Sequence, residues 1–150
     1  MKSEKNSGQG ITIIGTTEQK NNQAPLYSSR PAAGFPAPGD DQVERSLDIN
    51  DLVVKNPSAT FFVRVEGDSM EGAGIFSGDV LVVDRSIEAA HNHIVVAAVY
   101  GELVVKRLVK GGKDNMKLVS ENDAYEPITV SDNDECFVWG VVVGSVRQFQ

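Results

Sequence analysis

The feature that most constrains this chain is a succession of short aliphatic runs, separated by turn residues, between residues 60 and 146. Runs of this length that are rich in valine, isoleucine and phenylalanine are typical of β-strands. Turns at Tyr100-Gly101 and at residues 110–115 favour hairpins on both sides of the run at 102–109. We therefore predict a mainly β fold with strands at residues 60–66, 79–84, 93–99, 102–109, 116–120, 127–130 and 137–146.

The segment before these strands has a different pattern. Ile49, Leu52 and Val53 recur at helical spacing, and Asn56-Pro57 ends the pattern, so we expect one short helix there. Residues 1–40 are rich in Gly, Ser, Asn, Gln and Pro, which predicts an extended or disordered, flexible N-terminal arm. Residues 41–150 then form a single β-rich domain.

Composition excludes several classes of protein. The chain of 150 residues has a net charge of -7 and a pI near 4.8, which disfavours binding to nucleic acid by phosphate neutralisation and favours a protein partner. Cys136 is the single cysteine, so an internal disulfide is excluded. No segment resembles a signal peptide or a membrane span, and we expect a cytoplasmic protein.

Charge is divided unevenly along the chain. Residues 1–33 hold four Lys/Arg and two Asp/Glu, a net charge of +2, which leaves -9 for residues 34–150. A weakly basic arm therefore faces an acidic body.

The run ELVVKRLV at residues 102–109 contains a lysine in an unusual position. Successive side chains of a strand point to opposite faces, so Lys106 shares a face with Val104 and Leu108, while Arg107 lies on the other face. An ammonium among aliphatic side chains must reach water, find a partner or lose its proton. The pattern alone leaves open whether Lys106 is an ordinary strand residue that extends to solvent or a base.

A glycine-rich loop, VEGDSMEGAGIFSGD at residues 65–79, joins the first two predicted strands and contains Ser69. Glycines allow the backbone conformations and the close approach that a nucleophile loop with backbone oxyanion donors requires. Taken alone, a loop of this kind is more often an ordinary polar connection. Together with Lys106 it suggests a serine-lysine nucleophile pair, in which a neutral lysine accepts the hydroxyl proton.

Several motifs carry a resemblance to the LexA-type self-cleaving serine-lysine peptidase family: GDSM at 67–70, SGDVLVVD at 77–84, IVVAAVYGELVVKRL at 94–108 and AYEPITV at 124–130. The resemblance implies a LexA-like fold of antiparallel sheets with a short N-terminal helix. It also implies that Ser69 is the nucleophile and Lys106 the general base. Members cleave themselves between a small residue and a glycine, and RPAAGFPAP offers Ala33-Gly34 as the cleavage site.

Within the family, the chain resembles the UmuD branch. The 33 polar residues before the cleavage site carry no amphipathic helix pattern, so they cannot supply the DNA-binding helix-turn-helix of the repressors. The branch implies an SOS-response protein that forms a homodimer, is cleaved with a RecA filament on single-stranded DNA as co-protease, and then serves a UmuC-type translesion polymerase. The alternatives are a non-catalytic module that recruits polymerase and a LexA-type regulator without its DNA-binding domain.

Two further motifs are weak signals. HNH at 91–93 is compatible with a metal or nuclease site but lacks a third ligand, and SDNDE at 131–135 has Phe137 where a calcium loop needs glycine. We therefore expect no metal site, no cofactor, no direct sequence-specific binding to nucleic acid and no membrane association.

Overall fold

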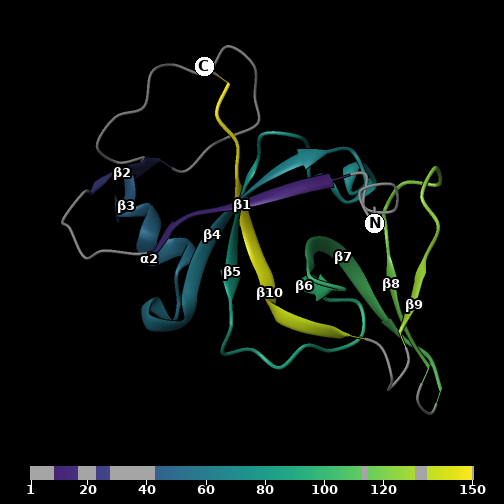
Figure 1. The fold of residues 1–150 in the computed structure, drawn as a ribbon. Helices are drawn as coiled ribbons and strands as arrows, with labels where there is room; N and C mark the ends of the chain where they lie inside the picture. Colours follow the sequence, from purple (N-terminus) through teal and green to yellow (C-terminus); the bar gives the residue numbers. More distant parts are fainter. Residues whose placement is uncertain (1–8, 17–22, 28–42, 113–114, 131–134, 150) are drawn as a thin grey trace.

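The structure, a computed structural model, describes residues 9–16, 23–27, 43–112, 115–130 and 135–149. Its main element is an antiparallel eight-stranded sheet with the strand order β1-β4-β5-β10-β6-β7-β8-β9 (Figure 1). All seven strands predicted from the sequence are present. They are β4 (Thr60–Gly67), β5 (Val80–Asp84), β6 (Ile94–Val99), β7 (Glu102–Lys110), β8 (Met116–Val119), β9 (Ile128–Val130) and β10 (Cys136–Val146). The mainly β, antiparallel fold class is thus confirmed.

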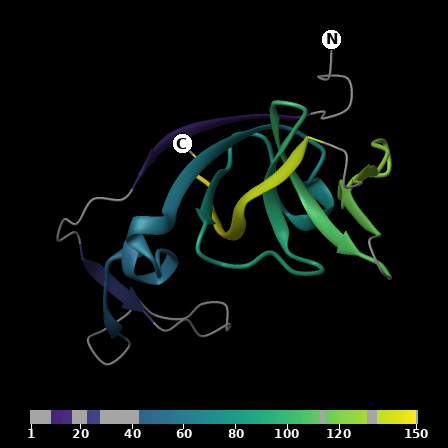
Figure 2. The ribbon, with the colours of Figure 1, turned by 60° about the horizontal axis from the view of Figure 1, so that its bottom comes forward.

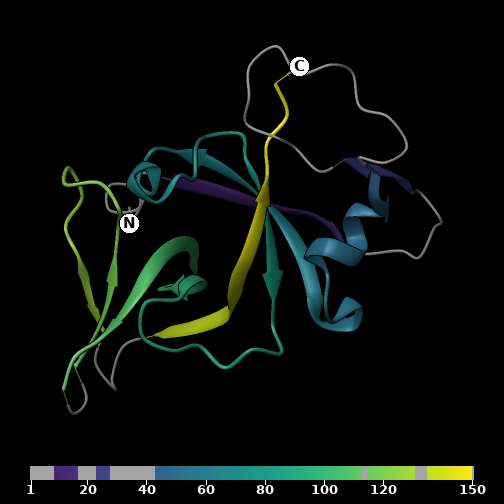
Figure 3. The same cartoon turned by 180° about the vertical axis from the view of Figure 1, so that it is seen from behind.

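Strand β10 joins the two halves of the sheet. Its first half pairs with β6 and its second half with β5 (Figure 3). The register shifts between Val138 and Gly140 and again between Val142 and Gly144. A Cβ atom at Gly140 would lie 2.7 Å from a methyl group of Val83, so a side chain there would collide with β5. The two bulges bend β10 where it passes from one partner strand to the other.

The core consists of two clusters on the sheet faces. One gathers side chains of β4, β5, β6 and β7 together with Met70 and Ile75 of the β4–β5 loop. The other gathers side chains of β6, β7, β8, β9 and β10, among them Val95, Val104 and Leu108. Because β6 and β7 contribute to both clusters, opposite faces of the same strands are buried, as continuous aliphatic runs require.

The predicted helix is present as α2 (Ile49–Val53). Asp48 caps it, since its carboxylate accepts a hydrogen bond of 2.8 Å from the backbone N–H of Asn50. Short 3-10 helices follow at Pro57–Ala59 (η2) and Glu71–Ala73 (η3). None of the helices in the described ranges is long and apolar enough to cross a membrane.

Three strands were not predicted. Strand β1 (Gln9–Thr16) pairs with β4, and β2 (Ala24–Tyr27) pairs with β3 (Val43–Leu47) in a separate two-stranded sheet. Figure 2 shows β1 running beside β4 along the sheet. Parts of the segment expected to be an arm are therefore extended strands, because β4 offers β1 a free edge and a cluster in which Ile11 packs.

Candidate active site

Lys106 lies in the middle of β7 and is 1% exposed. Its neighbours on the same strand face, Val104 and Leu108, belong to the second core cluster, and Val95 of β6 is its partner across the ladder. The predicted alternation of faces is confirmed. The alternative that Lys106 extends to solvent is wrong, because its side chain is buried on the strand face that carries the second core cluster.

The environment of Lys106 favours its neutral form. Burial lowers the pKa of the Lys106 ammonium from 10.5 to about 8, and the negative charge of Glu102 opposes this shift in part. Nζ donates a hydrogen bond of 2.6 Å to Oγ of Ser120 and lies 5.7 Å from the centre of the Tyr125 ring. A buried amine with a pKa close to neutrality is suited to accept a proton.

Arg107, the neighbouring cation on β7, makes contacts that hold the structure together. Its guanidinium forms an ion pair with Glu121 and donates a hydrogen bond of 2.7 Å to the carbonyl of Asn92. The side chains of Arg107 and Glu121 are both partly exposed to solvent. Arg107 thus joins two loops on the face of β7 opposite Lys106.

Ser69 lies in the loop that leaves β4. The residue is completely buried, and among the described residues its Oγ is the buried side-chain oxygen that has no hydrogen-bond partner. Met70, which follows it, is buried in the first core cluster and anchors the backbone at this point. A buried hydroxyl without a partner costs free energy, and a functional site is one reason to keep such a group.

The segment 120–125 contacts both Ser69's loop and Lys106. Ser120 at its start binds Lys106, the hydroxyl of Tyr125 donates to the carboxylate of Asp68, and Asn122 donates to the Asp68 carbonyl at 3.0 Å. The backbone N–H of Gly72 donates to the Glu121 carbonyl at 2.8 Å. The fold therefore brings Ser69 and Lys106 into one region, although no hydrogen bond joins these two side chains in the described structure.

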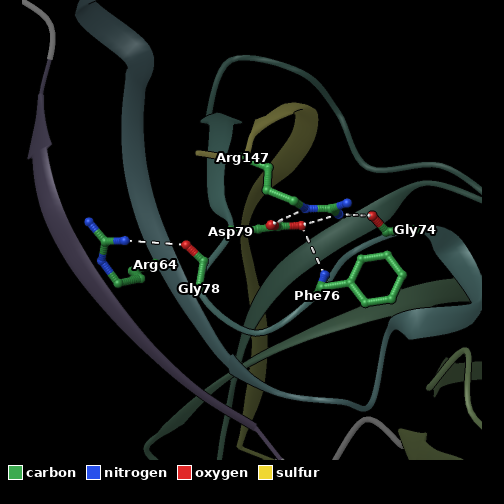
Figure 4. Close-up of polar contacts among 6 residues, drawn as sticks. All are labelled: Arg64, Gly74, Phe76, Gly78, Asp79 and Arg147. Carbon is green, nitrogen blue, oxygen red and sulfur yellow. Dashed lines mark hydrogen bonds and ion pairs between the residues drawn. The ribbon is translucent and has the colours of Figure 1, made fainter. Parts of the chain in front are cut away.

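The far end of the same loop is held by the C-terminal residues (Figure 4). Arg147 binds both carboxylate oxygens of Asp79, at 2.7 and 2.8 Å, and donates to the carbonyl of Gly74 at 2.9 Å. The guanidinium lies 4.4 Å from the centre of the Phe76 ring. The Arg147 hydrogen bonds lower the pKa of the Asp79 carboxyl group, which burial opposes. We call this set of contacts the Arg147 clamp.

The two histidines of the motif at 91–93 use Nδ1 in hydrogen bonds to the backbone. Nδ1 of His91 accepts a hydrogen bond from the backbone N–H of Lys110, and Nδ1 of His93 accepts one from Ala90, each at 3.0 Å. Across the described ranges, no three His, Cys, Asp or Glu side chains gather as metal ligands. Cys136, at the start of β10, is half-buried. Most of the acidic run at 131–135 and the predicted cleavage site Ala33-Gly34 lie outside the described residues.

Sequence reasoning missed Ser120 and the contacts of Tyr125. A signal for Ser120 was available, because the β7–β8 hairpin pairs Arg107 with Val119 and Leu108 with Leu118. Extending that register by one residue places Ser120 opposite Lys106. The predicted strand ended at Ser120, but its pairing partner was not deduced.

Comparison with known proteins identifies the class. Residues 25–143 match the Peptidase S24-like family, and this chain belongs to that family, whose members are self-cleaving serine peptidases. It is 42% identical over 123 residues to the protein MucA of Escherichia coli, covering 81% of this chain and 83% of MucA.

Two further relatives extend the match. The protein SamA of Salmonella typhimurium is 39% identical, covering 92% of this chain and 95% of SamA. The LexA repressor of Shewanella woodyi is 36% identical, covering 94% of this chain and 68% of the repressor. MucA and SamA are homologues of UmuD, and the chain is a UmuD-like protein of the SOS response.

Proposed function

We propose that this protein cleaves its own chain with Ser69 as nucleophile and Lys106 as general base. The observation that carries the proposal is the buried Lys106 amine, whose pKa is lowered to about 8. About one molecule in ten then holds a neutral amine at pH 7, compared with roughly four in ten thousand for an unperturbed lysine. The uncommitted Ser69 hydroxyl supports the assignment of the nucleophile.

The reaction conserves its protons. Neutral Nζ of Lys106 accepts the proton of Ser69 while Oγ attacks the scissile carbonyl carbon, and the resulting ammonium returns a proton to the leaving amine. Water then hydrolyses the acyl-serine with the same lysine as base. We expect a Ser69–Lys106 hydrogen bond to form when the cleavage segment is docked and water is excluded, because catalytic hydrogen bonds are often long in the apo state and tighten in the reacting complex.

The proposed cleavage site is Ala33-Gly34. Residues 1–40 act as the arm that carries this site to Ser69, and cleavage releases a product of 117 residues, 34–150. A small residue before the scissile bond suits a confined site, and prolines on both sides favour an extended segment. The remaining residues 41–150 form the peptidase domain.

The proposed partners follow from the family. A RecA filament on single-stranded DNA promotes docking of the arm, and the shortened homodimer serves a UmuC-type error-prone polymerase in the cytoplasm. The 42% identity to MucA over most of both chains supports this assignment over a LexA-type regulator.

The decisive experiment is the intact mass of the purified protein before and after incubation at about pH 10, beside Ser69→Ala and Lys106→Ala. We expect a fragment that begins at Gly34 in the wild type and in neither variant. The wild-type rate rises with pH through about 8 and then levels off, because the neutral amine accumulates. A rate that is flat from about pH 7 to 10 would contradict lysine as the base.

A further inference from the structure

Ser120 binds the amine of Lys106 through its hydroxyl group. It is 7% exposed, follows β8 directly, and its Oγ accepts a hydrogen bond from Nζ at 2.6 Å. Val104 and Leu108, which flank Lys106 on the same strand face, carry no side-chain acceptor. The contact is therefore a buried polar interaction beside two aliphatic neighbours on β7.

The direction of this hydrogen bond matters for the chemistry. A neutral amine has two N–H groups and one lone pair, and a general base must present the lone pair to the proton that it takes. The lysine side chain has four rotatable bonds, so its lone pair has no preferred direction by itself. A hydroxyl that accepts one N–H restricts the orientation of the amine and with it the direction of the lone pair.

We propose that Ser120 is a positioning residue for Lys106, whose hydroxyl oxygen accepts an N–H of the amine and so directs the lone pair toward Ser69. The proposal rests on the proposed function, because it assigns a role only if Lys106 is the base. It adds a third residue to the site beside Ser69 and Lys106, supplied by the 120–125 segment that also binds the Ser69 loop. Formation of the β7–β8 hairpin thus sets the direction of the base.

Other polar groups that the structure places near Lys106 have different contacts or effects. Glu102 on the same strand raises the Lys106 pKa, while the Tyr125 hydroxyl is engaged with Asp68. Glu121, next to Ser120, pairs with Arg107 on the opposite face of β7. Because an oxygen that accepts an N–H also stabilises the ammonium, removal of the Ser120 hydroxyl is expected to lower the pKa of Lys106 further.

The experiment combines a rate with a titration. Self-cleavage of the full chain is followed by intact mass from about pH 6 to 10.5, for wild type, Ser120→Ala and Ser120→Thr, and activated RecA filaments are added to each if the spontaneous reaction is too slow. The Lys106 pKa is measured separately by NMR of 13C-labelled lysine, in a Ser69→Ala chain with and without Ser120→Ala. Both titrated chains lack the Ser69 hydroxyl, so we expect them to stay intact while the pKa is measured.

We expect Ser120→Ala to lower the plateau rate at high pH by about tenfold or more, and to lower the Lys106 pKa. Ser120→Thr keeps the hydroxyl and should stay within about threefold of wild type. A purely structural role would lower the rate without moving the Lys106 pKa, and that outcome overturns the proposal. An unchanged plateau in Ser120→Ala overturns it as well.

The controls separate this proposal from the dyad itself. If Ser69→Ala or Lys106→Ala still cleaves, the proposed function fails. If both are inactive and Ser120→Ala cleaves like wild type, only the role of Ser120 fails.

Discussion

At the scale of single residues, burial of Lys106 opposes folding. Its pKa is about 8 in the folded protein and 10.5 as an ordinary value, so the unfolded chain binds more protons between these two pH values. The contribution of Lys106 to the free energy of unfolding therefore increases as pH rises from about 8 to about 10.5, and below pH 8 the full penalty for the buried ammonium is present. Burial of Lys106 therefore lowers stability at neutral pH and raises the fraction of Lys106 that is neutral.

Lys106→Met is expected to stabilise the protein. An apolar side chain of similar length removes the penalty, and the gain at pH 7 is up to about 3 kcal/mol, declining to nothing near the ordinary lysine pKa. Urea denaturation at several pH values measures it, with Lys117→Met on the exposed side of β8 as the control. A gain that does not change with pH would show that the packing of methionine, rather than the loss of a buried charge, stabilises the variant.

At the scale of elements, the loop between β4 and β5 is held at both ends. Segment 120–125 binds its first half through Asp68 and Gly72, and the Arg147 clamp binds its second half through Gly74 and Asp79. Asp79 is 1% exposed, so its charge depends on the guanidinium. The geometry of Ser69 therefore depends on contacts that come from two distant parts of the chain.

Arg147→Met is expected to lower both stability and cleavage rate. The variant leaves Asp79 buried without its guanidinium partner, which raises the pKa of that carboxyl group toward and above its ordinary value. Because Arg147 lowers the Asp79 pKa in the folded protein, its stabilising effect is present above pH 3.8 and is lost as pH falls through the lowered value. Thermal melts at pH 7 and in acid test this: the difference between variant and wild type should shrink in acid. An equal difference at both pH values contradicts an ionic clamp.

Strand β1 occupies the edge of β4 that leads to Ser69, since its register begins with Gln9 opposite Gly67. An extended cleavage segment that reaches Ser69 along β4 would need the same edge, because main-chain hydrogen bonds hold such a peptide. We expect deletion of residues 1–16 to accelerate self-cleavage about threefold or more. Deletion of residues 1–8 retains β1 and is the matched control. Equal rates for the two truncations, followed by intact mass, would show that β1 does not compete.

At the scale of the whole molecule, a basic N-terminal segment is joined to an acidic body. Residues 1–33 carry a net charge of +2 and the remainder carries -9. Long-range attraction of this kind assists docking of the segment at low salt and is screened at distances beyond about 10 Å at 0.1 M salt.

Self-cleavage is therefore expected to slow a few-fold between about 0.05 M and 0.5 M NaCl at fixed pH. The first-order rate, again by intact mass, measures the effect, and potassium glutamate at equal ionic strength serves as a control for specific ions. A rate that does not depend on salt would mean that contacts of the docked segment, and not the charge of the two parts, determine docking.

Much of the fold was predictable from the sequence. The seven strands from β4 to β10 follow from aliphatic runs and turn residues, and the short helix follows from local spacing and from Asn56-Pro57. Strands β1, β2 and β3 were missed because their own residues give a weak signal. They form where another strand offers an edge, as β4 does for β1, and such partners are distant in sequence.

The sequence by itself determined the class of fold, because aliphatic runs and turn residues are local properties of the chain. Its motifs also carried the family resemblance that singles out Ser69 and Lys106, the two residues proposed for the chemistry. Only the tertiary structure decided that Lys106 is buried with a pKa of about 8, that Ser120 binds its amine, and that Arg147 holds the loop of Ser69. The physical reason is that burial and hydrogen bonding depend on which strands and loops pack together, and the residues concerned are separated by 14 to 73 positions.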